Sequence, residues 1–446
     1  MVADDVLALL RRRPTVSSPE IAAELGISQP SVSRAVAELG DRVWRFGRGR
    51  ATRYAAVREV GAQGSRWPLF RIDATGQAHE VANLVALTHD RMVTDSSTAL
   101  LREGGTRDGW FDGLPWFLDD ARPQGFLGRI AARRLGPLLG APIDPLLWSN
   151  DHVLAAMLVD GDDLPGDLVL GEPMLERALT PVRDAPIADD MREAAYLARA
   201  DAALAGDIVG SSAGGEQPKF TARVRNAHGA LRHAIVKFTD RGDSPARRRW
   251  HDLLVSEHLA AECLHEAGVP AALSTLVSGE RTFLEIERFD RISERGRRGY
   301  VTLAALDNAL YGERDDWRRS ADRLERDGWI DESGARILRL LHYVGRLIAN
   351  TDMHFHNVSF ERGDARPLAV APAYDMLPML YRPAATGEIV EREAAPIPPP
   401  PRDTAIWHEA ARIALAFWER VADDARVGGD FRAIATRNAV QLKALA

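Results

Sequence analysis

The chain has 446 residues, 46% hydrophobic and 27% charged, an ordinary globular balance that leaves room for two or three domains. Its net charge of −7 excludes nucleic-acid binding through bulk charge, so any such binding has to be local. One cysteine, Cys263, excludes an intrachain disulfide and a CxxC zinc site. The N-terminus lacks the pattern of a signal peptide, and no run approaches the roughly 20 apolar residues of a membrane span. We therefore expect a cytoplasmic protein without a membrane partner.

Residues 1–60 are predicted to form a separate unit. Apolar periodicity predicts a first helix, Ser17-Ser18 offers a cap for a second helix, and a third helix spans about Gln29–Leu39. Two extended segments follow, Val43–Phe46 and Ala51–Tyr54, with a turn of glycine and arginine between them. This order is typical of a winged helix-turn-helix.

The same unit holds ten arginines and seven acidic residues, a local positive excess in an acidic chain. Arginines on the predicted hairpin can neutralise DNA phosphates, and short or polar residues of the third helix can face a major groove. The predicted DNA-contacting residues are Gln29, Ser31, Ser33, Arg34, Arg45, Arg48, Arg50 and Arg53. A winged helix used only for protein contacts is the alternative, and the hairpin arginines argue against it. A lone winged helix binds DNA weakly, which a homodimer would offset.

The rest of the chain divides into a mixed part, 66–292, and a helical part, 293–446. The strand candidates of the mixed part are Trp67–Ile72, Lys219–Val224, Leu231–Phe238 and Phe283–Phe289. In the second part nearly every periodic segment is helical. A mixed lobe followed by a helical lobe is the order of a kinase-like fold, so the predicted fold class is α+β.

The sharpest chemical signal is Asn350-Thr-Asp-Met-His-Phe-His-Asn357, which follows a helix with one apolar face. Phosphoryl transfer needs a carboxylate near the attacking hydroxyl and an amide oxygen on a metal ion. Asp352 and Asn357 fit these roles at the D-x-x-x-x-N spacing of a kinase catalytic loop. A polar turn that only ends the helix is the plain alternative.

A second acid, Asp375, follows an apolar stretch 23 residues after Asp352. An acid at the end of a buried strand can hold Mg²⁺ against ATP phosphates, although a solvated loop aspartate would give the same pattern. Lys237 lies in an otherwise apolar strand, where a lysine faces solvent or serves a site. In V-A-I-K strands such a lysine contacts the α- and β-phosphates and pairs with a helix glutamate, here Glu257.

The segment Ser211-Ser-Ala-Gly-Gly-Glu-Gln-Pro-Lys219 is small and polar, so its backbone N–H groups could approach phosphate oxygens. It departs from the Walker A pattern, and by itself it is only a flexible loop. The four signals occur in the order phosphate loop, lysine strand, catalytic loop and metal acid, and this ordered set favours a kinase.

With these motifs the chain resembles the HipA family of serine/threonine kinases. The resemblance rests on the phosphate loop and catalytic loop above, on Glu287-Arg-Phe-Asp-Arg291 and on Ala371-Pro-Ala-Tyr-Asp375. Leu114-Pro-Trp-Phe-Leu-Asp-Asp120 and Gly125-Phe-Leu-Gly128 resemble the N-terminal part of the family. The resemblance covers the chain from about residue 66 to its end.

The resemblance implies a bilobed kinase fold that uses ATP and Mg²⁺, with an all-α C-terminal lobe. It implies Asp352 as catalytic base and Asn357 and Asp375 as metal ligands. The implied nucleotide-binding residues are Ser211, Ser212, Gly214, Gly215, Lys219, Lys237, Glu257, Glu287 and Phe289, with the last two at the adenine hinge. Ser212 matches the serine that the family autophosphorylates.

Family members often act as toxins, phosphorylate translation components and work with a separate helix-turn-helix antitoxin. This chain carries its own helix-turn-helix, which leaves open whether it needs a separate antitoxin. It also has His356 where a lysine is expected before the asparagine. A small-molecule phosphotransferase and a catalytically silent, nucleotide-sensing regulator are the alternative functions.

Overall fold

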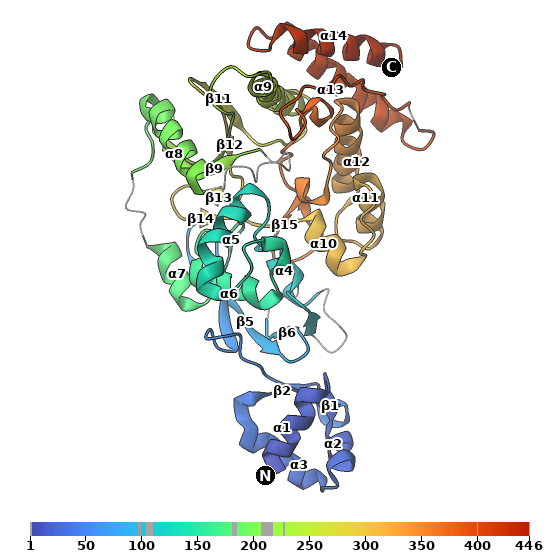
Figure 1. Ribbon diagram of the computed structural model, residues 1–446. Helices are drawn as coiled ribbons and strands as arrows, with labels where there is room; N and C mark the ends of the chain where they lie inside the picture. Colours follow the sequence, from blue (N-terminus) through green and yellow to red (C-terminus); the bar gives the residue numbers. More distant parts are fainter. Residues whose placement is uncertain are drawn as a thin grey trace.

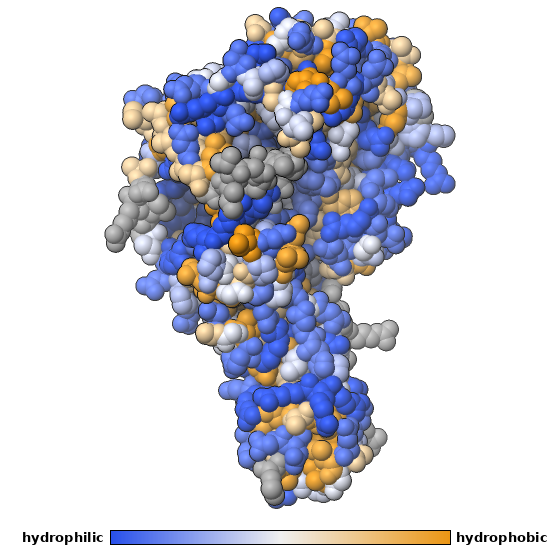
Figure 2. All heavy atoms as spheres, in the orientation of Figure 1, coloured by the Kyte–Doolittle hydropathy of each residue, from blue (hydrophilic) through white to orange (hydrophobic). Residues whose placement is uncertain are grey.

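The computed structural model describes residues 2–96, 98, 100–103, 110–180, 185–206, 217–225, 228–398 and 400–445. The chain folds into a small N-terminal domain, a middle domain and two kinase-like lobes (Figure 1). The N-terminal domain projects from one end of the larger body (Figure 2). None of the described helices combines the length and apolarity that crossing a bilayer would require.

The N-terminal domain is a winged helix-turn-helix, as predicted. Its elements are α1 (Val2–Arg12), β1 (Val16–Ser17), α2 (Ser18–Leu25), α3 (Gln29–Leu39), β2 (Val43–Phe46) and β3 (Arg53–Ala56), with strand order β1-β3-β2. Ser17 caps α2 in a capping box with Glu20, which decides between the two candidate serines. The second wing strand begins at Arg53 rather than Ala51, because Gly49–Ala51 forms a short 3-10 turn.

The wing packs against the middle domain. Phe46 lies edge-on to Trp110, with ring centroids 5.2 Å apart, inside a buried cluster that also contains Val85 and Leu87. The chain leaving β3 then pairs with the middle sheet, since the Thr88 N–H donates to the Ala56 carbonyl at 3.0 Å. Backbone pairing and apolar burial therefore both fix the N-terminal domain to the body.

The middle domain is a five-stranded antiparallel sheet covered by helices. Its elements are β4 (Arg66–Ile72), β5 (Ala78–Leu87), β6 (Arg91–Thr94), β7 (Trp110–Asp112), α4 (Trp116–Asp119), α5 (Gly125–Leu139), α6 (Asn150–Asp160), β8 (Leu168–Leu170) and α7 (Glu172–Leu179). The strand order is β7-β6-β5-β4-β8. The predicted range 66–292 thus contains this sheet and a second, separate one.

The second sheet forms the small kinase-like lobe, with strand order β11-β12-β10-β9. Its elements are α8 (Arg192–Gly206), β9 (Lys219–Arg225), β10 (Leu231–Phe238), α9 (Pro245–Glu266), β11 (Ser274–Ser278) and β12 (Thr282–Glu287), followed by the hairpin β13 (Arg291–Ile292) and β14 (Gly296–Arg297). Tyr196, Phe220, Phe238 and Phe283 bury one face of the sheet beneath α8. Helix α9 contacts β11 and β12, and its Glu257 side chain reaches Lys237 on β10.

The large lobe is mainly helical. Its helices are α10 (Leu303–Leu310), α11 (Trp317–Arg326), α12 (Glu332–Leu347), α13 (Thr404–Asp423) and α14 (Gly429–Lys443). It also contains a small sheet of β15 (Gly299–Thr302), β16 (Ser359–Arg362) and β17 (Ala369–Val370). The prediction that this lobe is entirely helical was therefore wrong. These strands are two to four residues long, too short for an alternation of apolar residues to reveal them.

Candidate active site

The catalytic-loop candidate begins where α12 ends. Ala349 adopts a left-handed conformation with φ 60°, which turns the chain out of the helix, and the Asn350 N–H closes the end by donating to the Gly345 carbonyl at 2.9 Å. Asn350 is buried, and its side-chain oxygen accepts from the Asp352 N–H at 2.9 Å. Its Nδ2 donates to the Asp375 carbonyl at 3.2 Å. One asparagine therefore ties the two candidate loops together.

Within this loop the backbone is fixed and one carboxylate is accessible. Asn357 Nδ2 and the His354 N–H both donate to the Asp352 carbonyl, at 2.8 and 2.9 Å. The Asp352 side chain is 45% exposed, whereas Asn357 is buried. An accessible carboxylate on a rigid loop is what a general base requires.

Lys237, Glu257 and Asp375 form a buried ionic cluster. Lys237 Nζ lies 2.6 Å from Glu257 Oε1 and 2.5 Å from Asp375 Oδ1. Burial opposes the charge of Lys237, but the carboxylates of Asp375 and Glu257 outweigh it and raise the lysine pKa. Burial likewise opposes ionisation of Asp375, but Lys237 and then Lys219 outweigh it and lower the Asp375 pKa to about 2. Lys237 and Asp375 are therefore charged near neutral pH, whereas burial raises the pKa of Glu257 against the opposing charge of Lys237.

Asp375 is held in an unusual backbone conformation. Its φ is 55°, a left-handed value that a non-glycine residue adopts uncommonly and that clusters at functional sites. The preceding segment is anchored by Ala373, whose N–H donates to the Pro270 carbonyl at 2.9 Å and which bridges to Ala271. This anchoring directs the acid towards the lysine.

The hinge candidates lie at the end of β12. The Glu287 N–H donates to the Leu273 carbonyl at 2.8 Å, and Phe289 stacks on Tyr374 with ring centroids 6.1 Å apart. A cavity of about 330 Å³ adjoins Glu287, Phe289 and Leu273. The aromatic stack connects the hinge to the segment that carries Asp375.

Two residues at the site were not assigned from the sequence. Asn350 opens the catalytic-loop motif and Tyr374 precedes Asp375, so motif position is the signal that could have found them. The Tyr374 hydroxyl donates to the His356 carbonyl at 2.6 Å and lies 2.7 Å from Ser359 Oγ. Burial lowers the pKa of His356 to about 4, so this residue brings no positive charge where a lysine was expected.

The remaining predicted nucleotide-binding residues belong to the phosphate loop and to β9. Ser211, Ser212, Gly214 and Gly215 lie outside the described residues. Lys219 faces Lys237 across the ladder between β9 and β10.

On the N-terminal domain, the side chains of seven of the eight DNA-contact candidates are described, and they differ in exposure. Gln29, Ser33, Arg34, Arg45 and Arg48 are exposed, and Ser31 is half-buried. Arg53 is half-buried and donates to the Thr15 side chain and carbonyl at 3.0 and 3.3 Å, which gives it a role within the domain. The side chain of Arg50 is outside the described set.

Three family models match consecutive parts of the chain. Residues 5–42 match the MarR family, 63–179 match the middle domain of the YjjJ-like toxin, and 211–439 match the HipA-like C-terminal domain. The three matches fall in the N-terminal domain, the middle domain and the kinase-like lobes; the first ends before the wing strands β2 and β3, and the third begins after α8.

Individual relatives agree with the family matches. Toxin YjjJ of Escherichia coli K12 is 38% identical over 433 residues, covering 94% of this chain and 93% of that protein. The HipA, HipB and operator DNA complex of the Shewanella oneidensis MR-1 toxin–antitoxin system contains a chain that aligns with a TM-score of 0.54 at 15% identity. That alignment covers 85% of this chain and 96% of the other, and it shows a shared fold. The chain therefore belongs to the HipA-like toxin family, alongside YjjJ, with a MarR-type helix-turn-helix at its N-terminus.

Proposed function

We propose that the chain is an ATP-dependent serine/threonine protein kinase that also binds DNA through its own N-terminal domain. The observation that carries this proposal is the meeting of Lys237, Glu257 and Asp375 beside the loop of Asp352 and Asn357. A structural ion pair would need only two of these groups. A lysine held by two carboxylates, joined through Asn350 to a loop with an accessible aspartate, has the parts that phosphoryl transfer requires.

The donor set fits Mg²⁺ and ATP. Mg²⁺ takes oxygen ligands, commonly one or two from protein together with substrate phosphates. Asp375 offers a carboxylate, and Asn357 can offer its amide oxygen because its nitrogen is already bonded to the Asp352 carbonyl. When bound, Mg²⁺ neutralises charge on the phosphates.

The residues of the chain supply the other tasks. Lys237 would bind ATP phosphates, with Glu257 keeping the lysine charged and oriented, and the cavity beside Glu287 and Phe289 would take the adenine. Asp352 would accept the proton of a serine or threonine hydroxyl. Asn350 would fix the position of Asp352 relative to Asp375, because it bonds to the backbone of both residues. Phosphoryl transfer depends on such positioning.

DNA binding is supported by the MarR-type match and by the exposed arginines of the wing. We propose operator binding that represses the gene of the protein, and a cytoplasmic protein substrate, with a translation component as the first candidate from the resemblance. A homodimer would raise the DNA affinity. The fused helix-turn-helix would take over the DNA-binding task for which other family members use a separate antitoxin.

The decisive experiment incubates the purified full-length chain with radiolabelled ATP and Mg²⁺ and maps any label by mass spectrometry. We expect label on serine, with Ser212 as the first site, in wild type and in the control Asp423→Asn, which changes an exposed aspartate at the end of α13. Asp352→Asn should carry none.

Three other outcomes would overturn parts of the proposal. Equal labelling of Asp352→Asn would remove Asp352 as the base. Transfer of label to small molecules alone would establish a small-molecule phosphotransferase. ATP binding without any transfer in wild type would leave a nucleotide-sensing regulator.

A further inference from the structure

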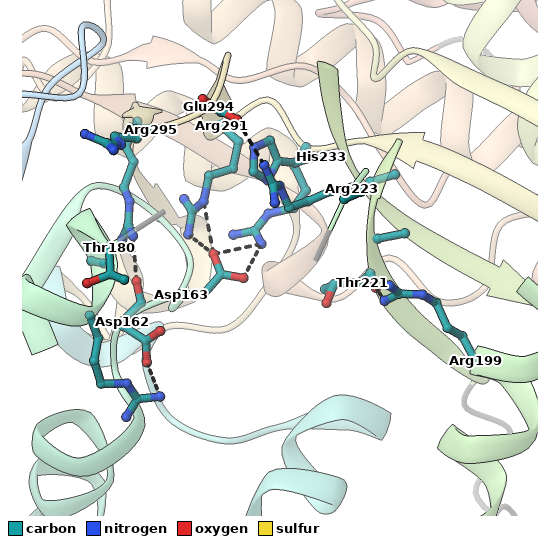
Figure 3. A pocket seen from close by; sticks show the side chains of 17 residues that line it. Asp162, Asp163, Thr180, Arg199, Thr221, Arg223, His233, Arg291, Glu294 and Arg295 are labelled. Atoms are coloured by element: carbon teal, nitrogen blue, oxygen red, sulfur yellow. Dashed lines mark hydrogen bonds and ion pairs between the residues drawn. The ribbon is translucent and has the colours of Figure 1, made fainter. Parts of the chain in front are cut away.

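A strongly basic cavity lies between the small lobe and the middle domain, away from the Lys237 cluster. Its volume is about 320 Å³, and β9, β10, α7, α8 and the β13–β14 hairpin contribute to its wall. Among the residues that the structure describes, seven arginines and three carboxylates line it (Figure 3). The arginines are Arg177, Arg199, Arg223, Arg288, Arg291, Arg295 and Arg297. An excess of four positive charges in one cavity is unexpected in a chain whose net charge is −7.

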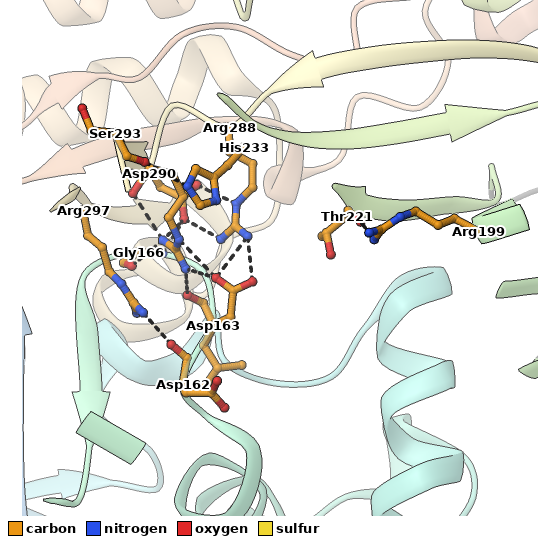
Figure 4. A network of polar contacts seen from close by, with 12 residues as sticks. Asp162, Asp163, Gly166, Arg199, Thr221, His233, Arg288, Asp290, Ser293 and Arg297 are labelled. Carbon is orange, nitrogen blue, oxygen red and sulfur yellow. Dashed lines mark hydrogen bonds and ion pairs between the residues drawn. The ribbon is translucent and has the colours of Figure 1, made fainter. Parts of the chain in front are cut away.

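The carboxylates account for only some of these arginines. Asp163 binds Arg288 and Arg291 at 3.3 and 2.7 Å, and both arginines also bind the buried Asp290 (Figure 4). Asp162 pairs with Arg177 at 2.8 Å, and Glu294 lies 3.5 Å from Arg223.

Three arginines remain without a carboxylate partner among the described residues. Arg199 donates to the Thr221 carbonyl, Arg297 donates to the Asp162 carbonyl, and Arg295 is exposed at the rim. Arg295 and Arg199 lie on opposite sides of the cavity (Figure 3). An anion between them would have guanidinium groups on two sides.

The burial of the Arg297 side chain gives an independent indication of an anion site. The residue is only 7% exposed, and its Nη1 is buried without a hydrogen-bond partner. Burial, followed by the charge of Arg291, lowers the pKa of Arg297 to about 10. A buried guanidinium is costly unless it is paired, and an unsatisfied buried group often marks an absent ion or water.

The wall of the cavity indicates the class of the anion. Guanidinium groups match phosphate oxygens through paired N–H donors. The other lining side chains include Ala178, Ala185, Ala222 and Ala234, and none of the described lining residues is a phenylalanine, tyrosine or tryptophan that could stack on a nucleobase. The volume is at the lower end of the range for ligand pockets, roughly 300–1,000 Å³.

We propose that this cavity binds a compact phosphate-bearing anion of about the size of pyrophosphate, held by Arg199, Arg295 and Arg297. His233, Arg288 and Arg291 line this cavity and also the one beside the hinge residues Glu287 and Phe289. These three side chains therefore separate the two cavities. The proposal does not depend on kinase activity, because it concerns a second site on the other side of the hinge segment.

The test is calorimetric titration of the full-length chain with pyrophosphate in buffer that contains EDTA and no Mg²⁺. We expect the double variant Arg199→Ala/Arg295→Ala to weaken binding by at least tenfold, because it removes two guanidinium groups that have no carboxylate partner among the described residues. Arg326→Ala in α11 is the control: it removes an exposed arginine in the other lobe and should bind as wild type does. Binding that the double variant leaves intact, or no binding by wild type, would overturn the proposal.

Two further measurements refine the ligand and the role of Arg297. A titration with glycerol 3-phosphate shows whether the site prefers a phosphate ester or a free polyphosphate. Tighter binding of glycerol 3-phosphate than of pyrophosphate would indicate an ester, and the reverse would indicate a polyphosphate. Citrate that binds as tightly as both would refute a phosphate site in favour of a general polyanion site. Pyrophosphate should raise the melting temperature of wild type but not of Arg297→Gln, and equal shifts would remove Arg297 from the site.

Discussion

Lys237 and Asp375 are 138 residues apart in the chain, yet their side chains meet at 2.5 Å. One comes from a central strand of the small lobe and the other from a loop of the large lobe, so the ion pair joins the lobes at the candidate site. Glu257 reaches the same ammonium group from α9. The position of each group therefore depends on charges from three separate elements.

Replacing Lys237 by Met should remove phosphoryl transfer and also destabilise the small lobe. The change leaves the buried Glu257 carboxylate and Asp375 without their shared cation, which costs about 3–5 kcal/mol in comparable buried pairs. Denaturant unfolding of the purified variant measures this loss. The double variant Lys237→Met/Glu257→Gln should regain part of the stability but no activity. A single variant as stable as wild type would show that the cluster is not electrostatically coupled.

Local patterns predicted some elements of this fold with their observed bounds. The predicted strand Leu231–Phe238 has the bounds of β10, and the helix expected at about Gln29–Leu39 has those of α3. Of the two serines predicted to cap the second helix, Ser17 does so. These signals lie within one element, because the side-chain period and the cap belong to neighbouring residues.

Relationships between distant elements could not be predicted in this way. The order of the five-stranded sheet, the packing of Phe46 on Trp110 and the network of Asp163 with Arg291 depend on tertiary contacts that no local period encodes. At the candidate site, motifs selected Lys237, Asp352 and Asp375. The connecting role of Asn350 appears only when the two loops are seen together.

The wing should bind DNA phosphates through Arg45 and Arg48, which are exposed. Replacing both by Ala should weaken binding and make the slope of log K against log salt shallower by about 0.9 for each lost phosphate contact. Fluorescence anisotropy over a salt series measures this slope. Arg12→Ala, an exposed arginine at the end of α1, is the charge-matched control. Replacing Arg48 and Arg50 by Ala should also weaken binding and make the slope shallower. An unchanged slope would show that the wing does not bind DNA phosphates.

Phe46→Ala should loosen the attachment of the N-terminal domain without unfolding it. The side chain is buried against Trp110, and truncating a buried phenylalanine costs about 3–5 kcal/mol. Small-angle scattering should show a larger radius of gyration than wild type. Val32→Ala, within the core of the N-terminal domain, is the control and should lower the stability of that domain without changing the scattering. An unchanged radius for Phe46→Ala would indicate that the backbone pairing of Ala56 with Thr88 holds the junction alone.

The free energy of unfolding should decrease as the pH is lowered from 7 to 5, in part because of His342. This residue of α12 is buried, its Nδ1 lacks a hydrogen-bond partner, and burial lowers its pKa from 6.5 to about 4. The unfolded chain therefore binds a proton at His342 from about pH 6.5 downwards, while the folded chain does so only near pH 4. The folded state loses stability as pH falls through this window, by roughly 2 kcal/mol at pH 5 for this one group.

His342→Leu tests this because leucine cannot take up a proton and fills similar space. The free energy of unfolding of the variant, measured in urea at pH 7 and pH 5, should fall by roughly 2 kcal/mol less than that of wild type. His408→Gln changes an exposed histidine of α13, so its pH dependence should match that of wild type. If His342→Leu and wild type lose the same stability on acidification, His342 is protonated in the fold, and its buried environment must contain a counter-charge that offsets desolvation.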